Sequence, residues 1–149
     1  EAYRLEDAEF AIVAIGSVCG TIKDAIDRLR ERGIKAGLLK VRVFRPFPGE
    51  EMAEALKHLR AVAIMDRCEG YNATGGPLGA ELTAALYRAQ ASAKTVNIIY
   101  GLSGRDVKVS DIEKVYEDLA ELAQGNNLFG EYPYLGLRNR SGDNYGADR

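Results

Sequence analysis

Hydrophobic residues in this 149-residue chain follow two alternating patterns. Apolar runs at residues 10–15 and 61–65 predict buried strands, because a strand covered on both faces needs no polar alternation. Residues 36–44, rich in Leu and Val, and residues 95–100 are expected to form two further strands. Between the runs, apolar residues recur at helical spacing, as in the set Ile22, Ala25, Ile26 and Leu29. The pattern therefore predicts strands that alternate with amphipathic helices, preceded by a short strand at residues 3–5.

Polar residues mark where the first and last of these helices are expected to begin. The last helix is expected to start at Ser110, because Ser110 and Glu113 have the spacing of a capping box. The first helix has two possible starts: a capping box of Thr21 with Asp24, or a cap at Ser17.

This order of elements predicts an α/β fold of three layers, α/β/α, around a five-stranded, mostly parallel sheet. We expect the domain to cover residues 1–124, where the helical period ends, and residues 125–149 to form a C-terminal tail. Phe129, Tyr132 and Tyr134 give this tail more aromatic area than free solvent favours. We therefore predict that the tail packs as an arm on a neighbour.

The carboxyl ends of parallel strands meet at one edge of a sheet, and ligands of open α/β folds bind at that edge. Four loops that follow expected strands would share it, at residues 16–17, 45, 66–76 and 101–106. The switch point, where neighbouring connections run to opposite faces, should lie between the loops that follow residues 15 and 65.

Composition narrows the function classes. A formal net charge of −2, with both signs interspersed, argues against a nucleic-acid or membrane-surface role. No apolar run approaches the length of a membrane span, and no signal-peptide pattern opens the chain. The start at Glu1 instead of Met indicates trimming or excision from something longer. Two cysteines are too few for a disulfide scaffold or a closed zinc site, so we expect a reducing, cytoplasmic setting.

The loop at residues 70–79 is the first candidate for binding chemistry. Gly75 and Gly76 precede Pro77 at an expected helix start, where backbone amides can hold a phosphate. The loop matches neither the dinucleotide fingerprint nor the P-loop. The favoured interpretation is that glycine is needed for backbone angles or for close approach of another subunit.

Three arginines at expected strand ends form the second candidate: Arg45, Arg67 and Arg105. They could clamp a carboxylate or phosphate, or pair with Asp66 and Asp106 to join loops or subunits. We favour structural pairing.

The remaining polar candidates carry little chemistry. Ser17 has a hydroxyl suited to an anion, but a helix cap is the simpler role. Cys19 and Cys68 have no neighbouring base to activate a thiol, and the single histidine, His58, is expected to be solvated.

Three stretches taken together resemble one family. They are residues 41–48 (VRVFRPFP), Asp66-Arg67 with residues 75–78 (GGPL), and Tyr100-Gly101 with residues 104–107 (GRDV). Their order and spacing resemble the C-terminal part of the alpha subunit of 2-oxoacid:ferredoxin oxidoreductases, most closely the pyruvate synthase (pyruvate:ferredoxin oxidoreductase) branch. The resemblance runs from about residue 3 to residue 122.

The resemblance implies a fold similar to the transketolase C-terminal domain, with residues 3–5 antiparallel to the other strands. It also implies an enzyme that oxidatively decarboxylates pyruvate on thiamine diphosphate with magnesium. The acetyl group would pass to coenzyme A, and the electrons would pass through iron–sulfur clusters to ferredoxin. Subunits of beta, gamma and delta type are the implied partners, and another 2-oxoacid remains open as the substrate.

The chain lacks the parts of that enzyme that carry cofactors. It has no Gly-Asp-Gly…Asn thiamine motif and no Cys-x-x-Cys run for a cluster. In the family, this domain is mainly a scaffold and subunit contact, so no catalytic residue is assigned and no cofactor is expected on the domain alone. The interface or ligand-edge candidates are Ser17, Arg45, Arg67, Gly75, Gly76, Arg105 and Asp106.

Two hypotheses follow. The first is a scaffold and interface domain of such an oxidoreductase, inactive alone, whose Arg45, Gly75–Gly76 and Arg105 loops are covered by neighbouring domains. The second is an independent α/β module that binds a phosphate or nucleotide through the glycine-rich loop at the switch point.

Overall fold

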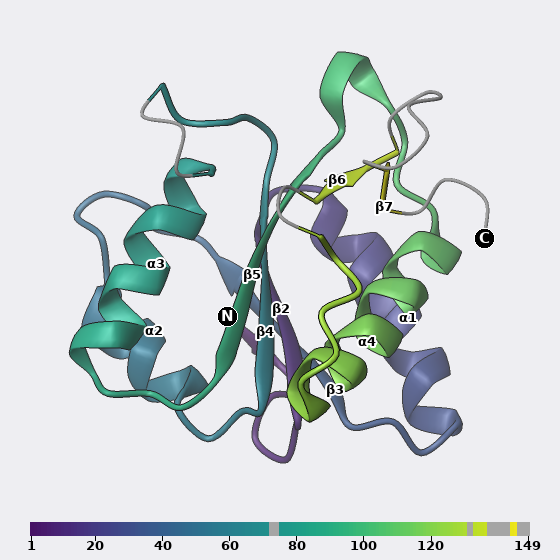
Figure 1. Cartoon of the computed structure of the whole chain (residues 1–149), viewed down its shortest axis with the longest axis horizontal. Coiled ribbons are helices and arrows are strands. Elements are labelled where there is room, and N and C mark those ends of the chain that lie inside the picture. The colour runs from purple at the N-terminus through teal and green to yellow at the C-terminus, as the bar shows by residue number, and fades with distance from the viewer. Residues whose placement is uncertain (72–74, 131–132, 137–143, 146–149) are drawn as a thin grey trace.

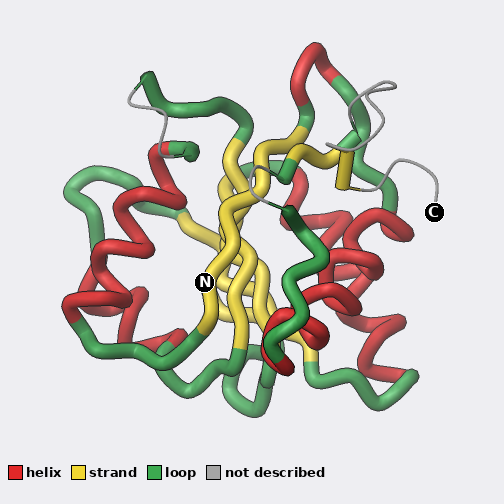
Figure 2. Tube along the Cα trace, viewed as in Figure 1, coloured by secondary structure: helices red, strands yellow, loops and turns green. Residues whose placement is uncertain are grey.

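The chain folds into three layers, with one sheet between two pairs of helices (Figures 1 and 2). This computed structural model describes residues 1–71, 75–130, 133–136 and 144–145. Helices α1 (Val18–Glu31) and α4 (Val109–Gln124) pack on one face, and α2 (Gly49–Leu56) and α3 (Pro77–Arg88) on the other. The three-layer α/β/α prediction is confirmed.

The sheet has strand order β1-β3-β2-β4-β5-β6-β7. Its long strands are β2 (Phe10–Ile15), β3 (Ala36–Val41), β4 (Ala61–Asp66) and β5 (Lys94–Tyr100), and these are mutually parallel. The short β1 (Ala2–Tyr3) runs antiparallel to β3, as the family resemblance implied. Because β2 and β4 are neighbours whose following helices lie on opposite faces, the switch point falls where it was predicted.

The expected five strands become seven in the structure. The additional strands are β6 (Tyr134–Leu135) and β7 (Asn144–Tyr145), which continue the sheet beyond β5 in parallel register. Strands of two residues carry no periodic pattern, so the hydrophobic pattern could not reveal them. The expected strand at residues 36–44 also ends earlier, at Val41.

The central strands are buried on both faces, which explains their continuous apolar runs. In β2, Phe10, Ile12 and Ala14 pack toward α1 and α4, whereas Ala11 and Val13 pack toward α2 and α3. Strand β4 divides its side chains between the same two cores. The two cores are therefore separated only by the sheet, and both depend on its register.

One predicted helix start needs correction, and for another the structure selects Ser17 from the two alternatives. Helix α4 begins at Val109, and the carboxylate that caps it belongs to Asp111, which accepts a bond from the Lys108 amide at 2.9 Å. The expected capping box of Ser110 with Glu113 is therefore wrong by two residues, because Asp111 takes the role expected of Glu113. Helix α1 begins directly after Ser17, which places Thr21 inside the helix.

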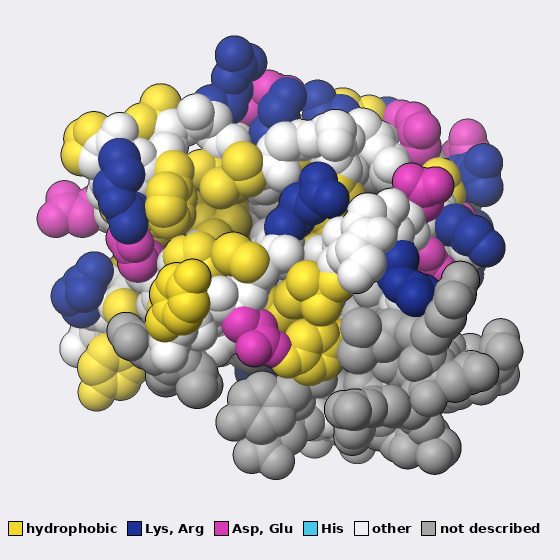
Figure 3. All heavy atoms as spheres, turned by 90° about the horizontal axis from the view of Figure 1, so that it is seen from above, with side chains coloured by type: hydrophobic (Ala, Val, Ile, Leu, Met, Phe, Trp, Pro, Cys, Tyr) yellow, Lys and Arg dark blue, Asp and Glu magenta, His cyan; other side chains and the backbone are white. Residues whose placement is uncertain are grey.

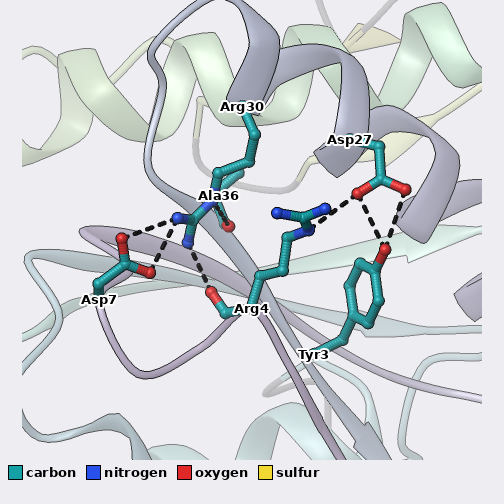
Figure 4. A network of polar contacts seen from close by, with 6 residues as sticks. All are labelled: Tyr3, Arg4, Asp7, Asp27, Arg30 and Ala36. Carbon is teal, nitrogen blue, oxygen red and sulfur yellow. Dashed lines mark hydrogen bonds and ion pairs between the residues drawn. The ribbon is translucent and has the colours of Figure 1, made fainter.

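Strand β1 is held to α1 by a cluster of polar contacts (Figure 4). The Arg30 guanidinium donates to the carbonyl oxygens of Arg4 at 2.6 Å and Ala36 at 2.8 Å. Asp27 accepts from the Tyr3 hydroxyl at 2.9 Å, and its carboxylate pairs with Arg4 at 2.9 Å. A two-residue strand has few ladder bonds, so these contacts fix its place at the sheet edge.

The tail begins at Gly125 with a left-handed residue that ends α4. Phe129 and Leu135 are buried in the core shared with α1 and α4, so the described part of the tail packs on its own domain. Tyr134 lies in β6, while Tyr132 falls outside the described residues. The division at residue 125 and the packing of an arm on a neighbour remain predictions.

Gly37 provides a test of the β1–α1 edge. A Cβ at this position would lie 2.8 Å from the Arg4 carbonyl oxygen and 3.0 Å from the Leu5 Cα, so backbone would have to move. We expect Gly37→Ala to lower the free energy of unfolding by about 1–3 kcal/mol, measured by urea denaturation. Gly20→Ala is the matched control, because a Cβ there, in the first turn of α1, meets nothing within 4 Å. It should stabilise by about 0.5–1 kcal/mol, and equal effects of the two substitutions would contradict the steric explanation.

Candidate functional site

Loops from four strands meet at the carboxyl edge of the sheet, as predicted. This edge is the upper side of Figure 1 and faces the viewer in Figure 3. The structure divides the seven candidate residues into separate groups. Ser17, Arg67, Arg105 and Asp106 line one cleft, while the other three, Arg45, Gly75 and Gly76, lie near the start or side of α3.

The start of α3 is filled by a buried carboxylate of the same chain. Asp66 ends β4 and is 7% exposed. One of its carboxylate oxygens accepts from the Leu78 amide at 3.0 Å, and the other from the Gly79 amide at 2.8 Å. The carboxylate thus occupies the place at a helix N-terminus where a phosphate would bind, and its charge suits the positive end of the helix.

Asn97, in β5, completes this arrangement. Its carbonyl oxygen accepts from the Gly76 amide at 2.7 Å, and its amide nitrogen donates to Asp66 at 2.9 Å and to the Ile64 carbonyl at 2.8 Å. Pro77 has no N–H. The Ala80 amide, which follows that of Gly79, donates to the Gly76 carbonyl within the helix. The amides from Gly76 to Ala80 are therefore all accounted for, and none is left to hold a ligand phosphate.

The glycines of this loop are explained by the same two side chains. A Cβ at Gly76 would overlap the Asp66 carboxylate, and a Cβ at Gly75 or Gly79 would overlap the Asn97 amide. Close approach is thus required, as the favoured interpretation held, but to side chains of the same chain. Sequence reasoning missed Asn97, although a single polar amide within the apolar run of residues 95–100 was a usable signal.

A cleft of about 270 Å³ opens at the start of α1. Its polar lining comes from α1, the end of β5 and the loops beside them, and consists of Ser17, Thr21, Arg67, Tyr100, Arg105 and Asp106. The Arg67 guanidinium lies 5.9 Å from the centre of the Tyr100 ring and donates to the Gly101 carbonyl at 3.4 Å. Burial raises the pKa of the Tyr100 phenol, so this hydroxyl stays neutral in the physiological range.

Arg45 is committed to an ion pair instead. Its guanidinium contacts both carboxylate oxygens of Glu81 on α3, at 2.5 and 3.2 Å, and stacks 4.2 Å from the centre of the Phe44 ring. The prediction of structural pairing identified the kind of contact but not the partner, because Glu81 lies in a helix far along the chain. Neither Asp66 nor Asp106 forms an ion pair with any of the three arginines in the described part of the chain.

The thiols and the histidine hold no reactive arrangement. Cys19 is buried in the core, where desolvation raises the pKa of its thiol, and Cys68 is exposed. A ring nitrogen of the exposed His58 lies 3.1 Å from the Leu5 carbonyl. Among the described residues, no three His, Cys, Asp or Glu side chains come together as a metal site. The described helices also include none that is long and apolar enough to cross a membrane.

These features define an open α/β domain in which the amides at the start of α3 are bonded to side chains of the same domain. Residues 8–112 match the family model described as pyruvate:ferredoxin oxidoreductase core domain II. The chain belongs to this family, and it is a domain of the alpha-subunit type found in 2-oxoacid:ferredoxin oxidoreductases.

Curated relatives agree with this assignment. Over 138 residues the chain is 44% identical to the pyruvate synthase subunit PorA of Thermotoga maritima, covering 93% of this chain and 34% of that protein. Over 125 residues it is 39% identical to the NADH-dependent phenylglyoxylate dehydrogenase subunit alpha of Aromatoleum evansii, covering 84% of this chain and 30% of that protein. The chain thus spans about a third of the length of these relatives.

A solved structure supports the fold. The 2-oxoglutarate:ferredoxin oxidoreductase from Magnetococcus marinus, whose structure contains 2-oxoglutarate, coenzyme A and succinyl-CoA, matches with a TM-score of 0.58. The match covers 80% of this chain and 19% of that one at 16% sequence identity, so it is evidence for the fold.

The stability of the N-terminal end of α3 should depend on Asp66. Asp66→Ala would leave the buried amides of Leu78 and Gly79 without acceptors, and we expect a loss of about 3 kcal/mol in the free energy of unfolding. Glu69→Ala, in the exposed part of the same loop, is the control and should change stability by less than about 0.5 kcal/mol. Similar values for the two variants in denaturant titrations would refute the capping role.

The two thiols should differ in reactivity. In the native chain, an aromatic disulfide reagent should modify Cys68 promptly and Cys19 only on unfolding, because the thiolate is the reacting form and burial raises the pKa of Cys19. Cys68→Ser should remove the fast phase of the absorbance trace. A fast phase that persists in this variant would show that Cys19 is accessible.

Proposed function

We propose that this domain is the scaffold and interface domain of the alpha subunit of a thiamine-diphosphate-dependent 2-oxoacid:ferredoxin oxidoreductase. The enzyme would decarboxylate pyruvate oxidatively, transfer the acetyl group to coenzyme A and pass electrons through iron–sulfur clusters to ferredoxin. Partner subunits of beta, gamma and delta type and a cytoplasmic location belong to the same proposal. Pyruvate is proposed on the strength of the 44% identity with a pyruvate synthase subunit.

The observation that carries the scaffold role is the filled start of α3. The helix start with the clearest ligand-binding pattern in the sequence has the amides of Gly76, Leu78, Gly79 and Ala80 bonded to Asp66, Asn97 or the helix itself. The edge that would hold a ligand is thus used to join β4, β5 and α3. The alternative, an independent phosphate- or nucleotide-binding module, finds the amides from Gly76 to Ala80 already bonded and is not favoured.

The cofactors of such an enzyme do not fit this chain. A four-iron or two-iron cluster takes four thiolate ligands, whereas the chain has two cysteines, one buried and one exposed. The chain also has no Gly-Asp-Gly…Asn motif for thiamine diphosphate and magnesium. We therefore place thiamine diphosphate, the clusters and the chemistry on other parts of the enzyme.

The relatives support a role that is independent of substrate. One is named for pyruvate and another for phenylglyoxylate, yet both share this domain at 39–44% identity. A domain that selected the 2-oxoacid would have to accommodate a methyl group in one enzyme and a phenyl group in the other. A common scaffold needs no such difference.

The proposal is tested on the native protein, purified by affinity under anaerobic conditions. We expect iron–sulfur subunits to copurify and a viologen dye to be reduced only when pyruvate and coenzyme A are both present. Other 2-oxoacids in the same assay identify the preferred substrate. A lone protein without dye reduction would overturn the proposal.

Thermal unfolding of residues 1–149, separated from the other parts of the enzyme, tests the alternative. A nucleotide or coenzyme A that bound this domain would stabilise it by about 2.7 kcal/mol when present at 100 times its dissociation constant. We expect no such change in thermal unfolding of the chain. A shift of this size in the wild-type chain would restore the binding-module hypothesis.

A further inference from the structure

Two arginines in the cleft at the start of α1 have no carboxylate partner. Among the described arginines, six pair with a carboxylate: Arg4, Arg30, Arg32, Arg42, Arg45 and Arg60. Four others do not. Arg28 and Arg88 belong to the last turns of α1 and α3, where the helix dipole favours a cation. Arg67 and Arg105 have no such compensation, and they line the same cleft.

The rest of the cleft does not neutralise them. Asp106 is the one carboxylate in the lining, and it forms no ion pair with either arginine among the described residues. Helix α1 begins at the cleft without an acidic residue in its first turn, so its positive end adds to the two guanidinium charges. The cleft therefore carries net positive charge and complements a carboxylate.

Exposed apolar side chains lie on the same edge. Ile15, directly before the loop that lines the cleft, is 41% exposed, and Val43, two residues beyond the end of the neighbouring β3, is 56% exposed. Figure 3 shows apolar and cationic side chains side by side on this face. A small ion bound in the cleft would leave these apolar side chains exposed, whereas a protein partner would bury them.

We propose that this cleft receives an acidic side chain from another domain or subunit of the same oxidoreductase. Its carboxylate pairs with Arg67 and Arg105, and apolar residues beside it cover Ile15 and Val43. About two thirds of the length of the relative from Thermotoga maritima lies outside the matched region, and an enzyme built in that way has further surface for such a contact. The inference rests on the proposed function, and it names the partner chemistry of the interface.

Zero-length cross-linking in the assembled complex identifies the partner. A carbodiimide activates a carboxylate, which forms an amide with a lysine amine in contact with it. We expect the R67K and R105K variants to yield a cross-link to an Asp or Glu outside residues 1–149, located by mass spectrometry. R88K, on the exposed end of α3, is the control. Links from R67K and R105K no more abundant than those from R88K, or links to Asp106 alone, would overturn the inference.

Charge reversal measures the contribution of the pair. We expect the double substitution R67E/R105E to weaken assembly by roughly 30-fold or more, as for a desolvated ion pair. Replacement of the cross-linked acid by Arg should restore assembly with R67E/R105E, which a merely structural role of the arginines would not allow. R88E should assemble normally, and unchanged denaturation midpoints confirm that the variants fold.

The outcomes separate this inference from the proposed function. If the wild-type protein joins no complex, the proposed function fails. If the wild type assembles and R67E/R105E assembles equally well, only the docking inference fails. Stabilisation of the wild type, but not of R67E/R105E, by inorganic phosphate would also overturn it, since the cleft would then be a site for a small oxyanion.

Discussion

The contact between the Asp66 carboxylate and the first turn of α3 holds the carboxyl edge of this domain together. It joins the end of β4 to the helix that follows, and through Asn97 it reaches β5 as well. Asp66 is a charged group buried at the switch point, and its two amide bonds and the helix dipole compensate for lost hydration. The glycines around it exist because any larger residue would displace this carboxylate or its amide partner.

At the carboxyl edge of the sheet, the start of α3 is bonded within the domain, whereas the start of α1 borders an open cleft. At α3, every amide from Gly76 to Ala80 has a partner within the domain or, for proline, no hydrogen to donate. At α1, the Ser17 side chain makes no capping bond, and two arginines face the cleft without carboxylates. The bonded amides at the start of α3 stabilise the domain itself. The unpaired arginines at the start of α1 are available for contact with a neighbour.

The sequence predicted the layers, the parallel order and the switch point, because buried strands such as residues 10–15 and 61–65 produce continuous apolar runs. It predicted which loops share an edge, and four of the candidates do line one cleft. It could not assign partners: the contacts of Arg45 with Glu81 and of Asp66 with Asn97 join residues 36 and 31 positions apart. Local pattern carries no information on such pairs, nor on strands of two residues such as β6.

The glycine-rich start of α3 has the sequence pattern of a phosphate-binding site, but its amides bind a carboxylate of the same domain. In an open α/β sheet, amides at a helix start next to the switch point are the available donors for an anionic ligand. Here a residue of β4 supplies the anion permanently, so the helix start contributes to stability instead of binding. Relatives named for pyruvate and for phenylglyoxylate are 44% and 39% identical to this chain, as a role in stability that does not involve the substrate would allow.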